Sequence, residues 1–329
     1  MPDTIMGCWV DLRRNWAEFP FESTMLAADK PQLIERVTQV LEPREETWTL
    51  FAMRDLTREQ FSAMEDMPLL ERSLWDNKDA AVFIRADGDA IIYVHHEDHL
   101  LIRVRANCDG MRQSVQEAKD MARLIAQTGT FAKDDRIGWL TARPQYAGTG
   151  LQVTYLMHLP MLSMMQQTKG LAARLQREHR FSLTPQTAQG EKNPACLFRL
   201  QNLFTAYDGT EKLMTAVGAV AEELTAKEDN LRRKILTHTN RSTYLDQVFR
   251  AYGILKYARR LTEAEFLGFW SKLRLGASAG LLPVSTDVVN QLLKQTAKEQ
   301  LLAQMDDTMD EHAIHFIRAD VVRAALNGG

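Results

Sequence analysis

The sequence contains few cysteines and no long run of apolar residues. Its three cysteines, Cys8, Cys108 and Cys196, lie far apart, without CxxC pairs or the spacing of a zinc ribbon. We therefore expect reduced thiols and a cytoplasmic protein. Apolar stretches of the roughly 18 residues that a membrane helix needs are absent, and residues 1–14 lack the apolar core and cleavage site of a signal peptide. These absences predict a chain that neither crosses a membrane nor carries a secretion signal.

An excess of charge of one sign is also absent. The chain has 40 Lys and Arg against 43 Asp and Glu, a net charge of −3. Such a balance gives no general attraction to nucleic acid or to anionic lipid, so we expect small-molecule or protein partners. The 329 residues, 45% hydrophobic and 25% charged, are enough for one large domain or two ordinary ones.

Hydrophobic periodicity divides the chain into a mixed part and a helical part. Residues 1–75 are mixed and predicted to be mostly helical, whereas residues 82–105 have a hairpin pattern with the tight-turn pair Asp87-Gly88. Helical spacing marks residues 111–128 and 210–237.

From about residue 229 the strand signals vanish and helical periodicity dominates. Thr262 and Glu265 have the spacing of a capping box, and Ser285 is placed to open a further helix. The pattern predicts an α+β domain over residues 1–228 and an all-helical C-terminal domain over residues 229–329.

The stretch HHEDH, residues 95–99, places three histidines and two acids within five positions. If residues 90–105 form one strand, His95, Glu97 and His99 share a face and could hold a metal ion. No distant Cys or His pair completes such a site, so a polar strand end is favoured over a metal, and we predict no metal. A third alternative is a lone catalytic carboxylate held over a cleft. Periodicity leaves this choice open.

Four segments resemble one enzyme family, in order along nearly the whole chain. HHEDHLLI resembles the NEEDHLRI strand of the ATP:guanido phosphotransferases, which include creatine kinase, arginine kinase and bacterial protein-arginine kinase. GWLTARPQYAGTGLQVTYLMHLP resembles GYLTxCPTNxGTGLRASVxxHLP, and LRRNWAEFPF resembles LARNxxxxPF. The tail from YLDQVFRAYG to LGASAGLL is similar to the C-terminal domain of protein-arginine kinase.

The resemblance implies an antiparallel sheet flanked by helices, and phosphoryl transfer from ATP and Mg²⁺ to a guanidinium group. In such enzymes a carboxylate orients and deprotonates the guanidinium, and arginines grip the phosphates. The carboxylate falls on Glu97, and the glycine loop falls on Gly148, Thr149 and Gly150. Arg143 occupies the position of the family's reactive cysteine.

The phosphate-binding arginines of the family have no counterpart in this alignment. Their positions are occupied by Trp9, Asp11, Leu101, Gln152 and Thr184. An acidic loop residue falls near Gln189, and the phosphoarginine-associated RDxxRA motif falls on Met309-Asp310 without its first arginine. We therefore expect the nucleotide site to be degenerate.

Energetic estimates favour loss of ATP binding. A hydrogen bond to a charged group contributes about 1.5–3 kcal/mol, so five lost contacts amount to roughly 7–15 kcal/mol, although such contributions do not add simply. Millimolar binding corresponds to only about 4 kcal/mol. The counter-argument is relocation, because Arg13, Arg103, Arg105 and Arg143 could form a rearranged phosphate site, of which we retain Arg143 and Arg103 as candidate cofactor-binding residues.

The sequence therefore predicts a protein-arginine kinase homologue that has lost ATP binding and phosphoryl transfer, with no cofactor. It would act as a regulatory or scaffold partner in bacterial protein quality control and stress response. Expected partners are an active protein-arginine kinase or a Clp-type chaperone system, and we expect a homodimer through the C-terminal helices. The alternative is an active, divergent protein-arginine kinase that binds ATP and Mg²⁺ and uses Glu97 as its base. A reader of phosphoarginine or another anion is a third hypothesis.

Overall fold

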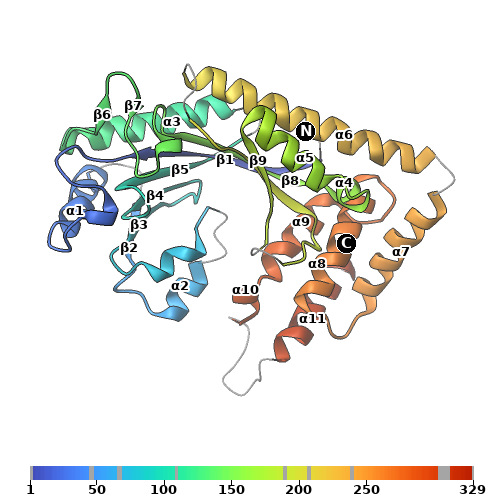
Figure 1. Cartoon of the computed structure of the whole chain (residues 1–329). Helices are drawn as coiled ribbons and strands as arrows, with labels where there is room; N and C mark the ends of the chain where they lie inside the picture. Colours follow the sequence, from blue (N-terminus) through green and yellow to red (C-terminus); the bar gives the residue numbers. More distant parts are fainter. Residues whose placement is uncertain are drawn as a thin grey trace.

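The computed structural model describes residues 3–43, 48–64, 69–107, 110–187, 191–205, 209–237, 241–302 and 312–327. An eight-stranded sheet occupies the centre of the molecule (Figure 1). Its strands are β1 (Ile5–Arg14), β2 (Trp48–Ala52), β3 (Ala81–Arg85), β4 (Ala90–Val94), β5 (Leu100–Ala106), β8 (Leu151–His158), β9 (Phe181–Pro185) and β10 (Leu197–Asn202). They are arranged in the order β2-β3-β4-β5-β1-β8-β10-β9, and every neighbouring pair is antiparallel. A two-stranded ribbon of β6 (Lys133–Asp134) and β7 (Gly138–Trp139) lies outside this sheet.

Strand β1 lies at the centre of the sheet, between β5 and β8. The prediction of mostly helical structure for residues 1–75 missed this strand. Its side chains alternate, so that Cys8, Val10 and Leu12 are buried in the main core while Trp9 and Asp11 point to the opposite face. The sequence of β1 therefore does alternate between apolar and other residues. The pattern is weak because the second face, although largely covered, carries the polar residues Asp11 and Arg13 together with Trp9.

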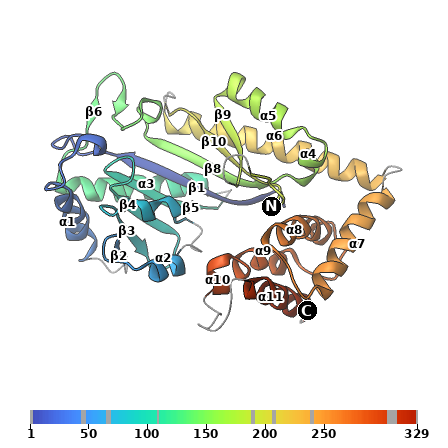
Figure 2. The same cartoon turned by 60° about the horizontal axis from the view of Figure 1, so that its bottom comes forward.

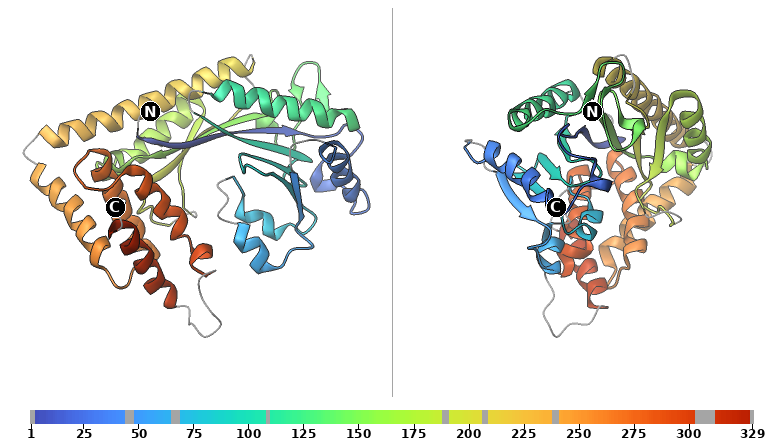
Figure 3. Two further views of the ribbon diagram at one scale, coloured as in Figure 1. Left: turned by 180° about the vertical axis from the view of Figure 1, so that it is seen from behind. Right: turned by 60° about the vertical axis from the view of Figure 1, so that its left-hand side comes forward.

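Helices cover one face of the sheet (Figures 1 and 3). They include α1 (Lys30–Leu41), α3 (Met111–Ile125) and the long α6 (Thr210–Thr237). Their apolar sides join the sheet in the largest buried cluster. Two shorter helices, α4 (Pro160–Met164) and α5 (Thr168–Arg174), connect β8 to β9. The predicted Asp87-Gly88 turn is confirmed, since β3 pairs with β4 around it and Gly88 has φ +72°.

The second face lies between two separate groups of helices (Figure 2). Helix α2 (Arg58–Met64) packs under β3 and β4 in a small apolar cluster with Phe61 and Tyr93. The C-terminal helices lie at the other end, and their residues form a third cluster with Met161 and Leu197. Helix α10 (Lys298–Leu302) of this second group contacts α2.

Within residues 241–302 and 312–327, the structure describes five helices of the C-terminal region. They are α7 (Arg241–Tyr257), α8 (Glu263–Ser278), α9 (Thr286–Gln295), α10 (Lys298–Leu302) and α11 (Ala313–Asn327). The predicted capping box is confirmed: Thr262 Oγ1 accepts the Glu265 amide at 3.3 Å, and Glu265 accepts the Thr262 amide at 3.0 Å. Ser285 caps α9 as expected. The α+β class with a helical C-terminal region is thus confirmed, and the expected boundary at 228/229 falls inside the continuous helix α6.

Buried polar contacts join the C-terminal helices to the sheet. The His158 ring accepts a hydrogen bond from Arg274 at 2.9 Å and contacts Ser271 Oγ at 2.8 Å. Arg274 also pairs with Asp3 at 3.0 Å. Burial, followed by the charge of Arg274, lowers the pKa of His158 well below its usual value. This histidine is therefore a neutral acceptor that fixes α8 against the end of β8.

Truncation of the central strand should destabilise the whole protein. Leu12→Ala removes a side chain with 0% exposure, and we expect it to lower the free energy of unfolding by about 2–5 kcal/mol. Urea denaturation followed by circular dichroism measures this change. The matched control is Leu26→Ala, because Leu26 is 68% exposed and should change stability by less than about 0.5 kcal/mol. Equal effects of the two variants would contradict a central position for β1.

Candidate functional site

The HHEDH stretch forms a turn. Strand β4 ends at Val94 and β5 begins at Leu100, so residues 90–105 do not form the single strand that was considered for a metal site. His95 has a left-handed backbone, with φ 59°. Because the chain reverses here, strand alternation does not bring His95, Glu97 and His99 onto one face.

Each histidine of the turn binds its own partners. His95 contacts Glu22 at 2.7 Å through Nδ1 and the Lys30 carbonyl at 2.8 Å through Nε2. His96 contacts Glu71 at 3.0 Å.

His99 accepts the Trp16 amide at 3.1 Å and donates to the Pro20 carbonyl at 2.8 Å. Burial lowers the pKa of His99, in keeping with this neutral tautomer. Within the described ranges, no three His, Cys, Asp or Glu side chains converge as metal ligands. The polar residues of this turn therefore have structural partners.

Asp98 connects the turn to the segment that contains Arg143. Its Oδ1 accepts Asn15 Nδ2 at 2.6 Å and the Ala142 amide at 2.7 Å. The neighbouring residues then meet, because Arg143 Nη2 donates to Glu97 Oε1. Both side chains are partly exposed, 34% for Glu97 and 55% for Arg143. The structure thus brings together the expected base and the arginine that occupies the family's cysteine position.

The glycine loop packs against the end of β1. Gly150 has φ +67°, and a Cβ there would lie 2.6 Å from Arg14 Nη1, so only glycine fits. Arg14 donates to the carbonyl of Thr149 at 3.2 Å, and Thr149 Oγ1 donates to the Thr205 carbonyl at 3.2 Å. Gly148 forms a bridge with Trp139. The loop is therefore held by its own backbone and by Arg14.

The five positions aligned with family arginines lie on one face of the sheet, called here the site face. Residues paired across antiparallel strands point to the same side. Asp11 lies opposite Gln152, and Arg13, which shares its side, lies opposite Leu101. Trp9 also shares this side.

The remaining position, Thr184, reaches the same face through two more strands. Leu156, which alternates in phase with Gln152 on β8, pairs with Arg199, and Arg199 pairs with Thr184. Segments far apart in sequence therefore converge on the site face, which is the face that lies between α2 and the C-terminal helices.

Each guanidinium nitrogen of Arg103 is hydrogen-bonded to another residue of the chain. Its Nε and Nη2 bind Asp11 at 2.6 and 2.8 Å, and Nη2 also binds Glu71 at 2.6 Å. Its Nη1 donates to the Leu69 carbonyl at 2.9 Å. Only 6% of Arg103 is exposed. As a candidate cofactor-binding residue, Arg103 therefore lacks accessible donors, because each guanidinium nitrogen already has an acceptor.

Glu71 completes this ion-pair group. Burial by itself would raise its pKa, but the hydrogen bond from His96 and the charge of Arg103 outweigh burial and hold the pKa of Glu71 well below its usual value. Sequence analysis missed Glu71, since PLLERSLW carries no motif. Only the fold brings it under β5.

Two further arginines lie on the site face. Arg13 donates to Gln152 Oε1 at 3.1 Å, lies 3.7 Å from Asp98 and stacks on Tyr146 at 4.1 Å, whereas its buried Nη1 has no hydrogen-bond partner. Arg199, also missed, lies 5.9 Å from the ring of Trp9 and donates to Gln186. Burial, and then the charge of Arg103, lowers the pKa of Arg199. Arg105 is exposed and pairs with Asp89 at the rim of the sheet.

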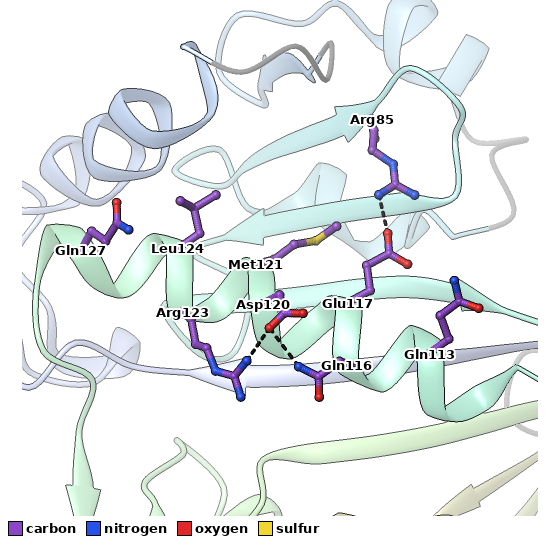
Figure 4. A pocket seen from close by; sticks show the side chains of 9 residues that line it. All are labelled: Arg85, Gln113, Gln116, Glu117, Asp120, Met121, Arg123, Leu124 and Gln127. Carbon is purple, nitrogen blue, oxygen red and sulfur yellow. Dashed lines mark hydrogen bonds and ion pairs between the residues drawn. The ribbon is translucent and has the colours of Figure 1, made fainter.

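A surface hollow of about 630 Å³ lies elsewhere, over α3 (Figure 4). Its charged side chains bind one another: Arg85 contacts Glu117, and Asp120 accepts from Arg123 and Gln116. The hollow belongs to the helix-covered side and contains none of the candidate residues.

Three of the sequence-based assignments lie outside the described residues: Gln189, Met309 and Asp310. Among the described helices, none combines the length and apolar composition required to cross a bilayer.

Comparison with known families gives two matches that follow each other along the chain. The ATP:guanido phosphotransferase C-terminal catalytic domain matches residues 31–231, and the protein-arginine kinase McsB C-terminal domain matches residues 241–328.

Two similar proteins are both protein-arginine kinases by name. The protein-arginine kinase of Syntrophomonas wolfei is 26% identical, with 99% of this chain and 92% of the relative covered. That of Brevibacillus brevis is 28% identical, over 89% of this chain and 84% of the relative.

Solved structures show the same fold at lower identity. A lombricine kinase superposes with a TM-score of 0.60 at 13% identity, covering 71% of this chain and 68% of the other. A duplicated taurocyamine kinase from Schistosoma mansoni gives 0.57 at 15% identity, covering 94% of this chain and 41% of the other. Since the catalytic-domain match alone spans more than half of the residues, this chain belongs to the ATP:guanido phosphotransferase family and is a McsB-like homologue of the protein-arginine kinases.

Proposed function

We propose that this chain is a protein-arginine kinase homologue without nucleotide binding or phosphoryl transfer, which acts as a regulatory or scaffold protein. The observation that carries the proposal is the pairing of Arg103 with Asp11 and Glu71 on the site face. Asp11 stands at a position where the family alignment expects an arginine. A carboxylate at this position repels phosphate. It also forms an ion pair with the nearest cation, Arg103, which is then not available to a ligand.

Charge balance on the site face supports the same proposal. Arg103, Arg13 and Arg143 each have a carboxylate within 4 Å. A triphosphate requires several cations whose donors point at the ligand, and donors already bound to carboxylates cannot be recruited without leaving those carboxylates unpaired. The residues present therefore do not fit a triphosphate, and we derive no reaction step through ATP or Mg²⁺.

The remaining donors do not compensate for this loss. The buried Arg13 Nη1 and Trp9 Nε1 have no hydrogen-bond partner, and each could donate to one ligand oxygen. Arg199, which donates to the neutral Gln186, is a third donor group on this face. These three donor groups are fewer than the five cationic contacts that the sequence resemblance predicts, and the indole nitrogen carries no formal charge.

The direct test is calorimetric titration with Mg·ATP. We expect no saturable binding at nucleotide concentrations up to about 1 mM, which corresponds to a binding free energy weaker than about 4 kcal/mol. A parallel assay should detect no phosphoarginine by mass spectrometry after incubation with ATP and an unfolded substrate protein.

Micromolar Mg·ATP binding, or phosphoarginine that disappears in Glu97→Gln, would overturn this proposal. The alternative of an active, divergent protein-arginine kinase with Glu97 as its base would then replace it. An Asp98→Asn variant would be unsuitable as a control, because Asp98 positions the turn that contains Glu97.

The ion-pair group also predicts a dependence of stability on pH. Because the pKa of Glu71 is lowered on folding, its ionised form stabilises the protein above the unfolded-state pKa of about 4.3, and this stabilisation is lost as the pH falls below that value. Glu71→Gln should lower the free energy of unfolding by about 1–3 kcal/mol at pH 7. The effect should be smaller near pH 3, where part of the stabilisation is lost, because the loss is complete only at the still lower pKa of the folded state.

Urea denaturation at both pH values measures this difference. The matched control is Glu222→Gln, which makes the same substitution on the exposed side of α6 and should show no such dependence. A Glu71→Gln effect that is equal at both pH values would contradict the ion-pair assignment.

We further propose that partners are proteins: a second copy of this chain, and an active protein-arginine kinase or a Clp-type chaperone system. Support for the homodimer comes from α7, where Phe249 is 49% and Tyr257 72% exposed. These residues lie two turns apart on either side of Gly253, where an added Cβ would meet open space. An antiparallel α7 pair crossing at Gly253 would place Phe249 of each copy against Tyr257 of the other.

Light scattering after size exclusion should therefore give about twice the chain mass of 37.5 kDa. The double variant Phe249→Ser/Tyr257→Ser should elute as a monomer, whereas Leu26→Ser, which alters an exposed leucine near the N-terminus, should remain dimeric. A monomeric wild type, or a dimer that survives the double substitution, would exclude this interface.

A further inference from the structure

Strand β9 forms one edge of the eight-stranded sheet, and among the described residues no strand pairs with its outer side. Two hydrogen bonds define its inner side, which faces β10. The Gln186 amide donates to the Leu197 carbonyl at 2.9 Å, and the Leu203 amide donates to the Arg180 carbonyl at 2.9 Å. Because the direction of bonding alternates along an antiparallel strand, the even-numbered residues of β9 bond inward.

The odd-numbered residues of β9 therefore present their backbone groups at the outer edge. Phe181 and Leu183 each offer an N–H and a C=O there, whereas Pro185 offers only a C=O. Within the described ranges, none of these groups has a hydrogen-bond partner. The side chains of Phe181 and Leu183 are buried in the main core, so the strand is fixed in place. Such an edge is a ready template for another extended segment.

Exposed cations lie beside this edge, on the helix-covered side of the sheet. Helix α5 and the π-helical turn that follows it, Leu175–His179, pack against β9 (Figure 2). Lys169 on α5, Arg177 on the turn and Arg180 directly before β9 are exposed, and none of them forms an ion pair within the described part of the chain. Residues 165–187 contain four Lys and Arg against one Glu, whereas the whole chain has a net charge of −3. The β9 edge is therefore locally basic.

The other charges of this stretch are accounted for. Arg174, the fourth cation, binds Glu223 of α6. The hydrogen bond to Glu223, and more weakly the charge of Glu178, raise the pKa of Arg174, so the single acid of the stretch acts on the cation that is already paired. The guanidinium of Arg180 lies 5.4 Å from the ring of Phe204, which holds it at the start of β9 and leaves it exposed.

We propose that the outer edge of β9 binds an extended acidic segment of a partner protein by antiparallel strand addition. The segment pairs its backbone with Phe181 and Leu183, and the residues opposite these two have their side chains on the α5 side. Acidic side chains at these alternate positions complement the three exposed cations. The inference rests on the proposed function only in that the partners are proteins, and it involves neither Glu97 nor a nucleotide.

The test is the affinity of the unmodified full chain for labelled acetyl-Gly-Glu-Val-Glu-Val-Glu-Gly-amide, measured by fluorescence anisotropy. We expect saturable binding. In antiparallel pairing the glutamate N–H groups face β9 and the valine N–H groups face away. N-methylation of every glutamate should therefore weaken binding at least about tenfold, since two backbone hydrogen bonds are lost. N-methylation of both valines keeps the same charges and should leave the affinity unchanged.

Protein variants test the cations. Lys169→Ala/Arg177→Ala should bind the peptide at least about threefold more weakly than the wild type. The matched control is Arg259→Ala/Arg260→Ala, which removes two exposed cations from the segment between α7 and α8 and should bind like the wild type. The peptide with lysine in place of glutamate should not bind. Circular dichroism checks that each variant is folded.

Four outcomes overturn the proposal. They are no saturable binding, equal affinity of the two methylated peptides or the reverse order, equal loss in the two double variants, and binding of the lysine peptide. Equal affinity of the methylated peptides would mean that charge alone attracts the ligand, as it would attract any polyanion. Mg·ATP binding would overturn the proposed function but leave these results unchanged, so the two failures are distinguishable.

Discussion

The position of β1 between β5 and β8 is the constraint on which the rest of the structure depends. Its antiparallel register sets Asp11 opposite both Arg103 and Gln152. The alternate residues, such as Val10 and Leu12, fill the main core. A shift of one residue would exchange the two sets and place Asp11 and Arg13 in the apolar core. The register is therefore fixed by the core, and the composition of the site face follows from it.

Once the register is fixed, the charges of the site face must be balanced locally. A buried guanidinium without a partner is costly, and Arg103 avoids this cost through Asp11 and Glu71. At the edge of the face, Asp98 lies 3.7 Å from Arg13 and accepts hydrogen bonds from Asn15 and from the Ala142 amide. The outcome is a set of internal ion pairs in a region where the sequence resemblance predicts cations available to a ligand. The exposed Glu97–Arg143 pair is the part of this set that solvent can reach.

The C-terminal helices belong to the same structural unit as the sheet. His158, at the end of β8, is bound to Ser271 and Arg274 of α8, and both His158 and Arg274 are buried. At the far end of this group, α10 contacts α2. The site face is thus bordered on both sides by helices (Figures 2 and 3).

Local features were determined by the sequence alone. The Asp87-Gly88 turn, the helix at residues 210–237 and the Thr262–Glu265 capping box depend on neighbours within a few positions, so the sequence predicts them correctly. The family motifs also identified, from the sequence, the five positions that lie on the site face. The partners of those positions were decided only by tertiary structure. Arg103 binds Asp11 across 92 residues of sequence, and Arg143 binds Glu97 across 46. Glu71 carries no motif at all. Such pairings arise from strand register and loop placement, which bring distant charges within bonding distance and which no local pattern of residues encodes.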